Sequence, residues 1–434
     1  MNKCLLTFLC FCTLWSSAQQ PKSLALQFAN ENTSLLFAVY KQMHAHPEIS
    51  TKELHTAAFL KNEMKTLGYK IVDSMGYYNF AAVLENGIGT TVLYRTDMDG
   101  LPVFEKTGLS YASKDSCMKE GVAVPSMHAC GHDMHMTTWL GLAKFLSTHK
   151  KNWKGTIIFL AQSAEETAQG AKAIVSSESF SKLPTCDIQL SIHNNAELPT
   201  GTFGFCNGYA MAAVDMMDIT IFGKGGHGAA PQNTIDPIVL SAQYINAIQT
   251  IVSRNLSSND PAVITVGAIH GGTVGNVVPD QVQLKLTIRS YSEASRKIIL
   301  QRLKEIGDNM SRGAGLTEDK LPQYKLLDMS IPAVYNNPEL GDRLSKIIKS
   351  NFGDTATKVI KPVMIGEDFS VYGLRNIPSY LIWTGTIANE EKILAREKNP
   401  LPSLHSAQFA PDAEVTIRSN ITMMAVLLLE LMKN

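Results

Sequence analysis

The chain has 434 residues, more than one ordinary hydrophobic core accommodates, so its length predicts two domains. Hydrophobic residues make up 45% of the sequence and charged residues 18%, a balance typical of a folded globular protein. The formal net charge of +0 gives no reason to expect nucleic acid or an anionic membrane as a partner.

The N-terminal segment has the pattern of a secretory signal peptide. Lys3 precedes an apolar run over residues 4–15, and Ser16-Ser17-Ala18 offers small residues for cleavage. We therefore expect removal of residues 1–18 near Ala18 and a secreted or periplasmic protein, with an N-terminal membrane anchor as the alternative. Because no later segment has about 18 uninterrupted apolar residues, we expect no membrane span in the mature chain.

The first half of the chain alternates helical and strand patterns. Residues 34–68 have helical periodicity with a break at His46-Pro47-Glu48. The expected strands are residues 71–84, 90–94, 156–162 and 188–193. Helical stretches separate these strands, which predicts a layered α/β domain.

A second unit is expected between about residues 214 and 331, because its elements follow the order βαββαβ. The expected elements are strands 215–222, 262–268, 281–290 and 324–331 with helices 237–252 and 293–310. Such an order forms a compact ferredoxin-like unit. The helix, strand and helix expected over residues 339–351, 379–384 and 411–432 are typical of a return to the first domain. We therefore predict an α/β fold in which a layered domain with a mixed sheet, residues 30–211 and 332–434, carries an inserted domain at residues 212–331.

The run from His128 to His135 gathers five side chains that can bind a first-row metal. Its sequence is His-Ala-Cys-Gly-His-Asp-Met-His, and the apolar, helix-like residues 136–146 follow it. A Cys and a His two positions apart can converge on one ion from the turn before a helix. Since a lone histidine would favour an ordinary core role and five such groups do not, the run predicts a metal site.

The cysteines that would remain after cleavage are Cys117, Cys130, Cys186 and Cys206. Four thiols in so long a chain are not a disulfide scaffold, although a Cys186–Cys206 bridge is conceivable. We expect Cys130 to be a thiolate held by metal.

Further polar residues follow the ends of predicted strands, where ligand sites of α/β sheets gather. Asp97 and Asp99 follow one strand, Glu165-Glu166 follows another, and His193 closes a third. His405 lies in a late loop. An adjacent carboxylate pair allows one member to bind metal while the other acts as a general base; a solvated helix start is the alternative for Glu165-Glu166.

In combination these residues resemble the di-metal amidohydrolases related to aminoacylase, hippurate hydrolase and auxin–amino-acid conjugate hydrolases. The resemblance runs from about Leu35 to the C-terminus. Its motifs are Arg95-x-Asp97-Met-Asp99-x-Leu-Pro102, His128-Ala-Cys-Gly-His-Asp133, Gln162-x-Ala-Glu-Glu166, Gly223-Lys-Gly-Gly-His-Gly228 with Pro231 and Asp236-Pro-Ile, Asn276-Val-Val-Pro279, Gly366-Glu-Asp-Phe369 and Leu404-His405.

The resemblance implies two divalent ions, Zn²⁺ or Mn²⁺, with Cys130 as a candidate bridge. The implied ligands are Cys130, His132, Glu166, His193 and His405. Glu165 is implied as the general base that takes a proton from the attacking water and passes one to the leaving amine.

In family members the inserted domain is a lid and a dimerisation domain. His227 is implied to stabilise the oxyanion, often in the site of the partner subunit, and a turn histidine is the alternative. Asn276 is implied to bind substrate, with an ordinary turn residue as an equal alternative. A potential free strand edge in this domain also predicts a homodimer.

Several positions depart from the family. Asp97 stands where broader peptidase relatives have a histidine ligand, which leaves Asp99 with a supporting role at most. Ser163 and Gly100 are mild departures. We expect His128 and His135 to lie outside the ligand set. The histidines interpreted as ordinary surface or core residues are His44, His46, His55, His149 and His270.

The leading hypothesis is metal-dependent hydrolysis of the amide bond of an N-acyl or N-aminoacyl amino acid. A carboxypeptidase or dipeptidase with the same centre is the nearest alternative. A hydrolase with Cys130 as nucleophile and His132 or His193 as base, or a non-catalytic binding protein, would not require the Glu165-Glu166 pair. Acyl and amino-acid preferences are not fixed by any motif.

Overall fold

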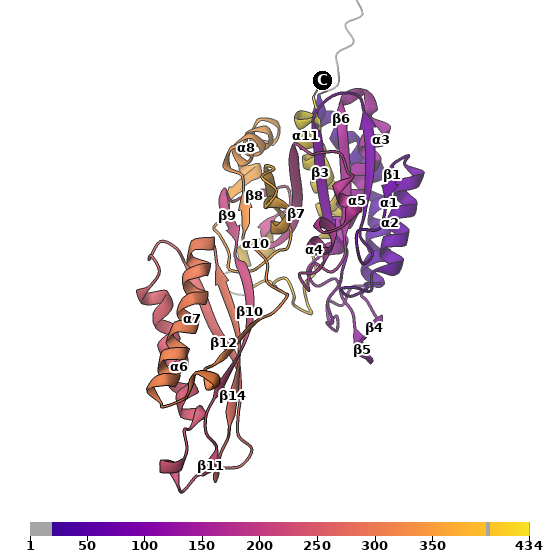
Figure 1. Ribbon diagram of the computed structural model, residues 1–434. Helices are drawn as coiled ribbons and strands as arrows, with labels where there is room; N and C mark the ends of the chain where they lie inside the picture. Colours follow the sequence, from indigo (N-terminus) through magenta and orange to yellow (C-terminus); the bar gives the residue numbers. More distant parts are fainter. Residues whose placement is uncertain (1–19, 396–399, 434) are drawn as a thin grey trace, which may run out of the picture.

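The computed structural model describes residues 20–395 and 400–433, and it has two lobes (Figure 1). The larger lobe contains an eight-stranded mixed sheet, and the smaller lobe contains a four-stranded antiparallel sheet. The predicted α/β class with a large mixed sheet is confirmed. The predicted signal peptide at residues 1–18 lies outside the described residues.

The centre of the large sheet is parallel, and this fixes where polar residues meet. The sheet order is β1(Lys70–Val72), β2(Phe80–Asn86), β6(Gly155–Gln162), β3(Thr91–Asp97), β7(Ile188–Pro199), β18(Ser379–Ile387), β8(Phe203–Phe205) and β17(Thr357–Val359). Strands β6, β3, β7 and β18 run parallel to one another. Asp97 pairs with Gln162, and Arg95 pairs with Ser191, two residues before His193. The three strands therefore carry Asp97, Gln162 and His193 to one edge of the sheet.

Helices cover both faces of this sheet. On one face, α1(Pro21–Ala45), α3(His132–Thr148) and α11(Ala413–Leu431) pack against one another and share an apolar core with side chains such as Phe80 and Tyr94. On the other face, the short helices α4(Gly170–Val175), α5(Glu178–Ser181) and α9(Ser370–Gly373) pack over Leu93 and Leu160. The remaining helices of this lobe are α2(Leu54–Thr66), α8(Pro338–Phe352) and α10(Glu390–Ala395). Burial on both faces explains why β6 is almost continuously apolar.

The smaller lobe has a core of its own. Its elements in chain order are β10(Ala213–Phe222), α6(Pro237–Arg254), β12(Ala262–His270), β14(Gln281–Ser290), α7(Glu293–Gly313) and β15(Gln323–Leu326), and the sheet order is β12-β14-β10-β15. Alternate residues of β10 and β14 are buried against α6 and α7, which lie on one face of the sheet (Figure 1). Asp236 and Ser292 cap these helices by accepting backbone N–H groups of the first turn.

Small two-stranded sheets complete the fold. They pair β4(Ser116–Lys119) with β5(Val122–Pro125), β9(Gly208–Met211) with β16(Val334–Asn336), and β11(Gly226–His227) with β13(Val277–Val278). The β11–β13 pair lies at the tip of the smaller lobe, far from the large sheet (Figure 1).

Four predictions of element bounds were wrong. The strand predicted over residues 71–84 is two antiparallel strands, β1 and β2, with residues 73–79 between them. Helix α1 begins at Pro21 rather than near residue 34, because Leu24, Ala25 and Phe28 give its first turns a buried face. Strand β7 continues past His193 to Pro199, since β18 pairs with it over that length. Strand β15 ends at Leu326 rather than Ile331.

The described cysteines are all free thiols, so Cys186 and Cys206 are not bridged. Over the described ranges, no helix combines the length and the apolar character needed to cross a membrane.

His44 is a buried partner of two carboxylates rather than an ordinary histidine. Its Nδ1 lies 2.7 Å from Asp133 Oδ2 and its Nε2 lies 3.1 Å from Glu105 Oε1. Burial lowers the pKa of His44, but the hydrogen bonds to Asp133 and Glu105 outweigh it and raise the pKa to about 10. The charged imidazole thus ties α1 to the first turn of α3, next to His132.

We expect His44→Gln to lower the free energy of unfolding at pH 6 by about 3 kcal/mol, because two buried carboxylates lose their cation. The raised folded pKa gives a stabilisation that is complete below the unfolded value of 6.5 and disappears as the pH rises towards 10. In urea unfolding experiments, the difference in the free energy of unfolding between wild type and variant should therefore decrease from pH 6 to pH 10. His46→Gln, which removes the exposed His46–Asp115 pair, is the matched control; equal losses in both variants would contradict the role of His44.

Candidate metal centre

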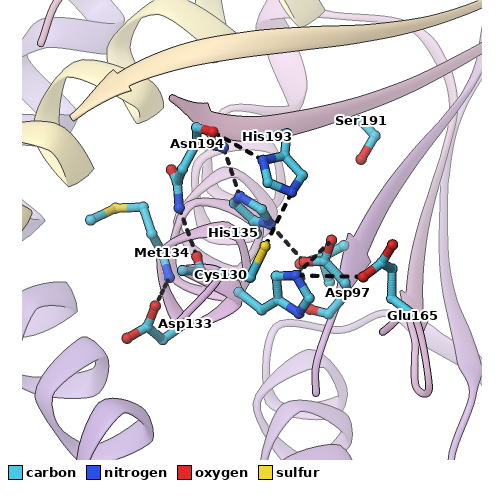
Figure 2. Close-up of polar contacts among 12 residues, drawn as sticks. Asp97, Cys130, Asp133, Met134, His135, Glu165, Ser191, His193 and Asn194 are labelled. Carbon is cyan, nitrogen blue, oxygen red and sulfur yellow. Dashed lines mark hydrogen bonds and ion pairs between the residues drawn. The ribbon is translucent and has the colours of Figure 1, made fainter. Parts of the chain in front are cut away.

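The other four predicted ligands lie around the thiol of Cys130: in the groups Cys130, His132, His193 and Cys130, Glu166, His405, the ligand atoms lie within 4.8 Å of one another. Cys130 Sγ lies 3.6 Å from His193 Nε2 and 3.3 Å from His405 Nε2. Glu166 Oε1 lies 3.3 Å from the same nitrogen of His405. Figure 2 shows the sulfur of Cys130 directed towards His193. The turn before α3, strand β7, the turn after β6 and a late loop thus contribute donors to one point.

His132, the fifth predicted ligand, is buried among carboxylates without a hydrogen bond. Its Nε2 lies 3.7 Å from Asp97 Oδ2 and 3.9 Å from both Glu165 Oε2 and Glu166 Oε1, and its Nδ1 lies 3.4 Å from Asp99 Oδ1. Both ring nitrogens of His132, Asp99 Oδ1 and Glu166 Oε1 have no hydrogen-bond partner among the described residues. Buried polar atoms without partners are costly, and a divalent cation would satisfy them. The donor set of nitrogen, oxygen and sulfur therefore fits a metal centre.

The electrostatic field at this point favours positive charge. Burial lowers the pKa of His132, but Asp97 and Asp99 outweigh it and raise the pKa to about 10. Burial, with Glu367 and Glu166 adding to it, raises the pKa of Glu165 well above its usual range. A bound cation would lower the pKa of both groups, because it opposes the field of the carboxylates.

The same field disfavours Cys130 as a nucleophile. Burial and then the neighbouring Glu166 and Glu165 raise the pKa of the Cys130 thiol. Burial and His135 lower the pKa of His193 to about 3, which makes it a poor base. A thiolate at this place requires a cation beside it, as expected for a metal ligand.

His135 lies close to Asp97 and His132, but both of its ring nitrogens already have hydrogen-bond partners. Its Nδ1 donates to Asp97 Oδ1 at 2.6 Å, and its Nε2 accepts the backbone N–H of Asn194 at 3.0 Å (Figure 2). Asp97 in turn accepts a hydrogen bond from Arg95 at 2.7 Å. His135 therefore orients Asp97 rather than offering a free nitrogen.

Arg95 is the buried counter-charge of the carboxylates beside Glu165. Its guanidinium lies 3.0 Å from Asp368 Oδ1 and 3.0 Å from Glu367 Oε1, and it donates to Gln162 Oε1. Carboxylate oxygens of Glu165, Glu367 and Asp368 lie within 4.8 Å of one another. From the sequence, Glu367 and Asp368 are recognisable only as part of a family motif. Their contact with Arg95 could not be predicted, because Asp368 is 273 positions away from it in the chain.

The turn that carries Glu165 and Glu166 is strained and held by side chains from elsewhere. Ala164 has φ +54°, a left-handed conformation that non-glycine residues rarely adopt. Glu53 Oε1 accepts the N–H of Ala164 at 2.7 Å, Asn79 Oδ1 accepts that of Ser163 at 2.6 Å, and Asp99 Oδ2 accepts that of Glu166 at 3.0 Å. Three separate segments thus fix the direction of the two glutamates. No sequence motif singled out Glu53 or Asn79.

His227 and Asn276 do not reach this cluster within one chain. His227 lies in β11 at the tip of the smaller lobe, where its side chain is exposed and its Nδ1 accepts the N–H of Ala229. The backbone oxygen of Asn276 accepts the N–H of Gly228 beside it. The structure therefore brings these two residues together and keeps both away from Cys130.

The comparisons with known proteins agree with this geometry. The model of "Peptidase family M20/M25/M40" matches residues 93–415. An "N-acetylcysteine deacetylase" of Bacillus subtilis is 32% identical, over 82% of this chain and 89% of that protein. A "Thermostable carboxypeptidase 1" of Saccharolobus solfataricus is 33% identical, over 88% of this chain and 91% of that protein. A solved Bacillus subtilis protein titled "a Dinuclear Metal Binding Peptidase from M20 Family" has a TM-score of 0.74 and 27% identity, and the match covers 92% and 99% of the two chains.

The chain therefore belongs to peptidase family M20/M25/M40. It is a metal-dependent amidohydrolase.

The predicted secreted or periplasmic location is overturned by the comparisons, because the relatives are named as N-acetylcysteine and N-acetyldiaminopimelate deacetylases and neither name indicates secretion. The prediction rested on the apolar pattern of residues 1–18, which lie outside the described part of the chain. An apolar run reports hydropathy alone, and hydropathy does not fix the compartment in which a protein acts.

We expect Glu53→Ala to lower kcat by about 10-fold or more, because the strained turn loses the acceptor that holds Ala164. Burial and Asp99 raise the pKa of Glu53 to about 8, so Glu53→Gln should keep the hydrogen bond and most of the activity. Adding Ala164→Gly to Glu53→Ala should restore part of kcat, since glycine adopts positive φ without strain. Steady-state kinetics of these variants, with the exposed Glu85→Ala as control, tests the prediction; equal kcat losses in the Gln and Ala variants would contradict it.

Proposed function

We propose that this enzyme hydrolyses the amide bond of N-acyl or N-aminoacyl amino acids at a centre of two divalent ions. The residues that would hold these ions are Cys130, His132, Glu166, His193 and His405. The observation that carries the proposal is the set of buried donors without partners around Cys130 and His132, with a second carboxylate, Glu165, held beside it. The relatives named deacetylases and carboxypeptidases support the reaction class.

In this mechanism Glu165 is the general base. When bound, the ions supply Lewis acidity that polarises the scissile carbonyl and makes water easier to deprotonate. Glu165 takes a proton from the attacking water and delivers one to the leaving amine. Arg95, through Glu367 and Asp368, balances the negative charge next to Glu165. Glu165 itself lies 3.9 Å from His132 Nε2, whereas Arg95 acts on it only through Glu367 and Asp368.

The chemistry of the donor atoms leaves two candidate ions. A thiolate donor favours Zn²⁺, whereas the mixed set of nitrogen, oxygen and sulfur also tolerates Mn²⁺. A carboxypeptidase or dipeptidase would use the same centre, and the carboxypeptidase relative keeps this as the second candidate function.

We propose that the smaller lobe acts as a lid and joins two chains. Strand β12 is an edge strand with one partner, and Val263 and Ile269 along it are 37% and 50% exposed. Pairing of β12 with a second copy would cover this edge. In such a dimer His227 of one subunit would stabilise the oxyanion in the partner's site, with Asn276 beside it on substrate.

We expect chelation to abolish hydrolysis and Zn²⁺ or Mn²⁺ to restore it. Glu165→Gln should keep its metal content but lose about 10²–10⁴-fold in kcat, since it removes the base and not a ligand. Metal analysis and kinetics of this variant, with the exposed Glu178→Gln as control, measure both effects. Activity that persists in chelator and is lost on alkylation of Cys130 would overturn the metal mechanism in favour of a thiol nucleophile.

We expect His227→Ala and Glu165→Gln to be inactive alone and to complement each other when mixed. A hybrid dimer has one site with both native residues, so random exchange should restore about a quarter of wild-type activity. Light scattering establishes the dimer, and subunit exchange followed by an assay tests the contribution in trans. A monomer in solution, or hybrid dimers without activity, would refute the role of His227.

A further inference from the structure

The proposed centre is bordered by a cavity of about 400 Å³ that no step of the mechanism uses. Its walls come from the end of β7, from β18, from the segment after β17 and from the loop before His405. The lining includes the side chains of Ile360, Val363, Ile365, Trp383, Leu401 and Leu404. All six are apolar or aromatic.

The lining of the cavity includes residues next to two of the proposed ligands. Asn194 in its wall follows His193, and Leu404 in its wall precedes His405. The ring of Trp383 lies 5.2 Å from the ring of His193. A substrate whose carbonyl lies at Cys130 would therefore have part of its structure within reach of this space.

The chemistry of the walls selects an apolar group. Among the described residues of the lining, the polar ones are Asn194, Asn195, Ser403 and the exposed Glu197, the one ionisable side chain. A charged group beside Trp383 would therefore lose water without gaining a buried counter-ion. Ile365 is 49% exposed at the rim, and an apolar group bound there would remove its surface from water.

A second cavity near the centre differs in this respect. It is about 440 Å³ and borders Glu166, and its lining includes Lys52, Lys119 and Glu120. Charged groups of a substrate find partners there, which leaves the cavity beside Trp383 for the apolar part.

We propose that the cavity between Trp383 and Ile365 is a specificity pocket that binds an apolar substituent of the N-acyl amino acid, of at least the size of a leucine side chain. This rests on the proposed function. The substituent is either the amino-acid side chain or the acyl chain, which share the same chemistry.

Two substrate series distinguish these sources. In the first, N-acetyl derivatives of glycine, alanine, leucine and phenylalanine vary the side chain; in the second, acetyl, butanoyl, hexanoyl and benzoyl groups vary the acyl part of N-acyl glycine. We expect kcat/KM of the metal-loaded wild type to rise by about 10-fold or more along one series. The series that rises identifies which part of the substrate occupies the pocket.

Variants at Ile365 tie the rise to the cavity. Because its side chain is half exposed, Ile365→Ala and Ile365→Asp should fold; circular dichroism and metal content check this. We expect Ile365→Ala to shrink the rise and Ile365→Asp to abolish it, each measured as the ratio of kcat/KM for the larger substrates to that for N-acetylglycine. Ile88→Ala, at a side chain that is 99% exposed and outside the cavity lining, is the matched control and should keep the full rise.

The outcomes separate the two proposals. Hydrolysis of all substrates at similar kcat/KM, or an equal effect of the Ile365 variants on N-acetylglycine and on the larger substrates, would overturn the pocket alone. Failure of the metal-loaded wild type to hydrolyse any member of either series would overturn the proposed function and the pocket with it.

Discussion

The structure depends on an excess of buried negative charge at one edge of a parallel sheet. Asp97, Asp99, Glu165, Glu166 and Glu367 are all buried or nearly so around His132, where carboxylates are expensive to keep ionised. Arg95 compensates part of this charge. The rest is visible as raised pKa values of Glu165 and His132 and as donor atoms without partners. Two divalent cations would neutralise this excess charge and bind the donor atoms that have no partner. They would also supply the Lewis acidity that hydrolysis of an amide requires.

The surrounding scaffold keeps these groups from relaxing apart. His135 holds Asp97, Glu53 and Asn79 hold the strained turn at Ala164, and His44 ties the start of α3 to α1. Each contact joins segments that are distant in the chain. Preorganisation of this kind means that the ligands are already positioned, so little binding energy is lost to rearrangement when ions arrive.

The two lobes carry different parts of the proposed site. The large lobe supplies all five proposed ligands and the general base, whereas the tip of the smaller lobe carries His227 and Asn276 well away from them. A single chain thus has a complete set of donors but no oxyanion group from the smaller lobe. In the proposed dimer, His227 of the partner chain would stabilise the transition state. The apolar cavity beside Trp383 would select the substrate.

The sequence by itself determined the α/β class, the βαββαβ order and the candidate metal ligands, because strand periodicity and a dense run of donors are local signals. Those signals failed where contacts with a distant segment set the end of an element. Strand β7 runs to Pro199 because β18 pairs with it, and α1 starts at Pro21 because its first turns have a buried face. Only the tertiary structure shows that His44 is a buried cation between two carboxylates. It also shows that Glu53 and Asn79 hold the turn that carries Glu165. It also separated His227 from the centre to which its motif assigns it. Burial, strain and counter-charge are properties of contacts between distant segments, so no residue pattern along the chain contains them.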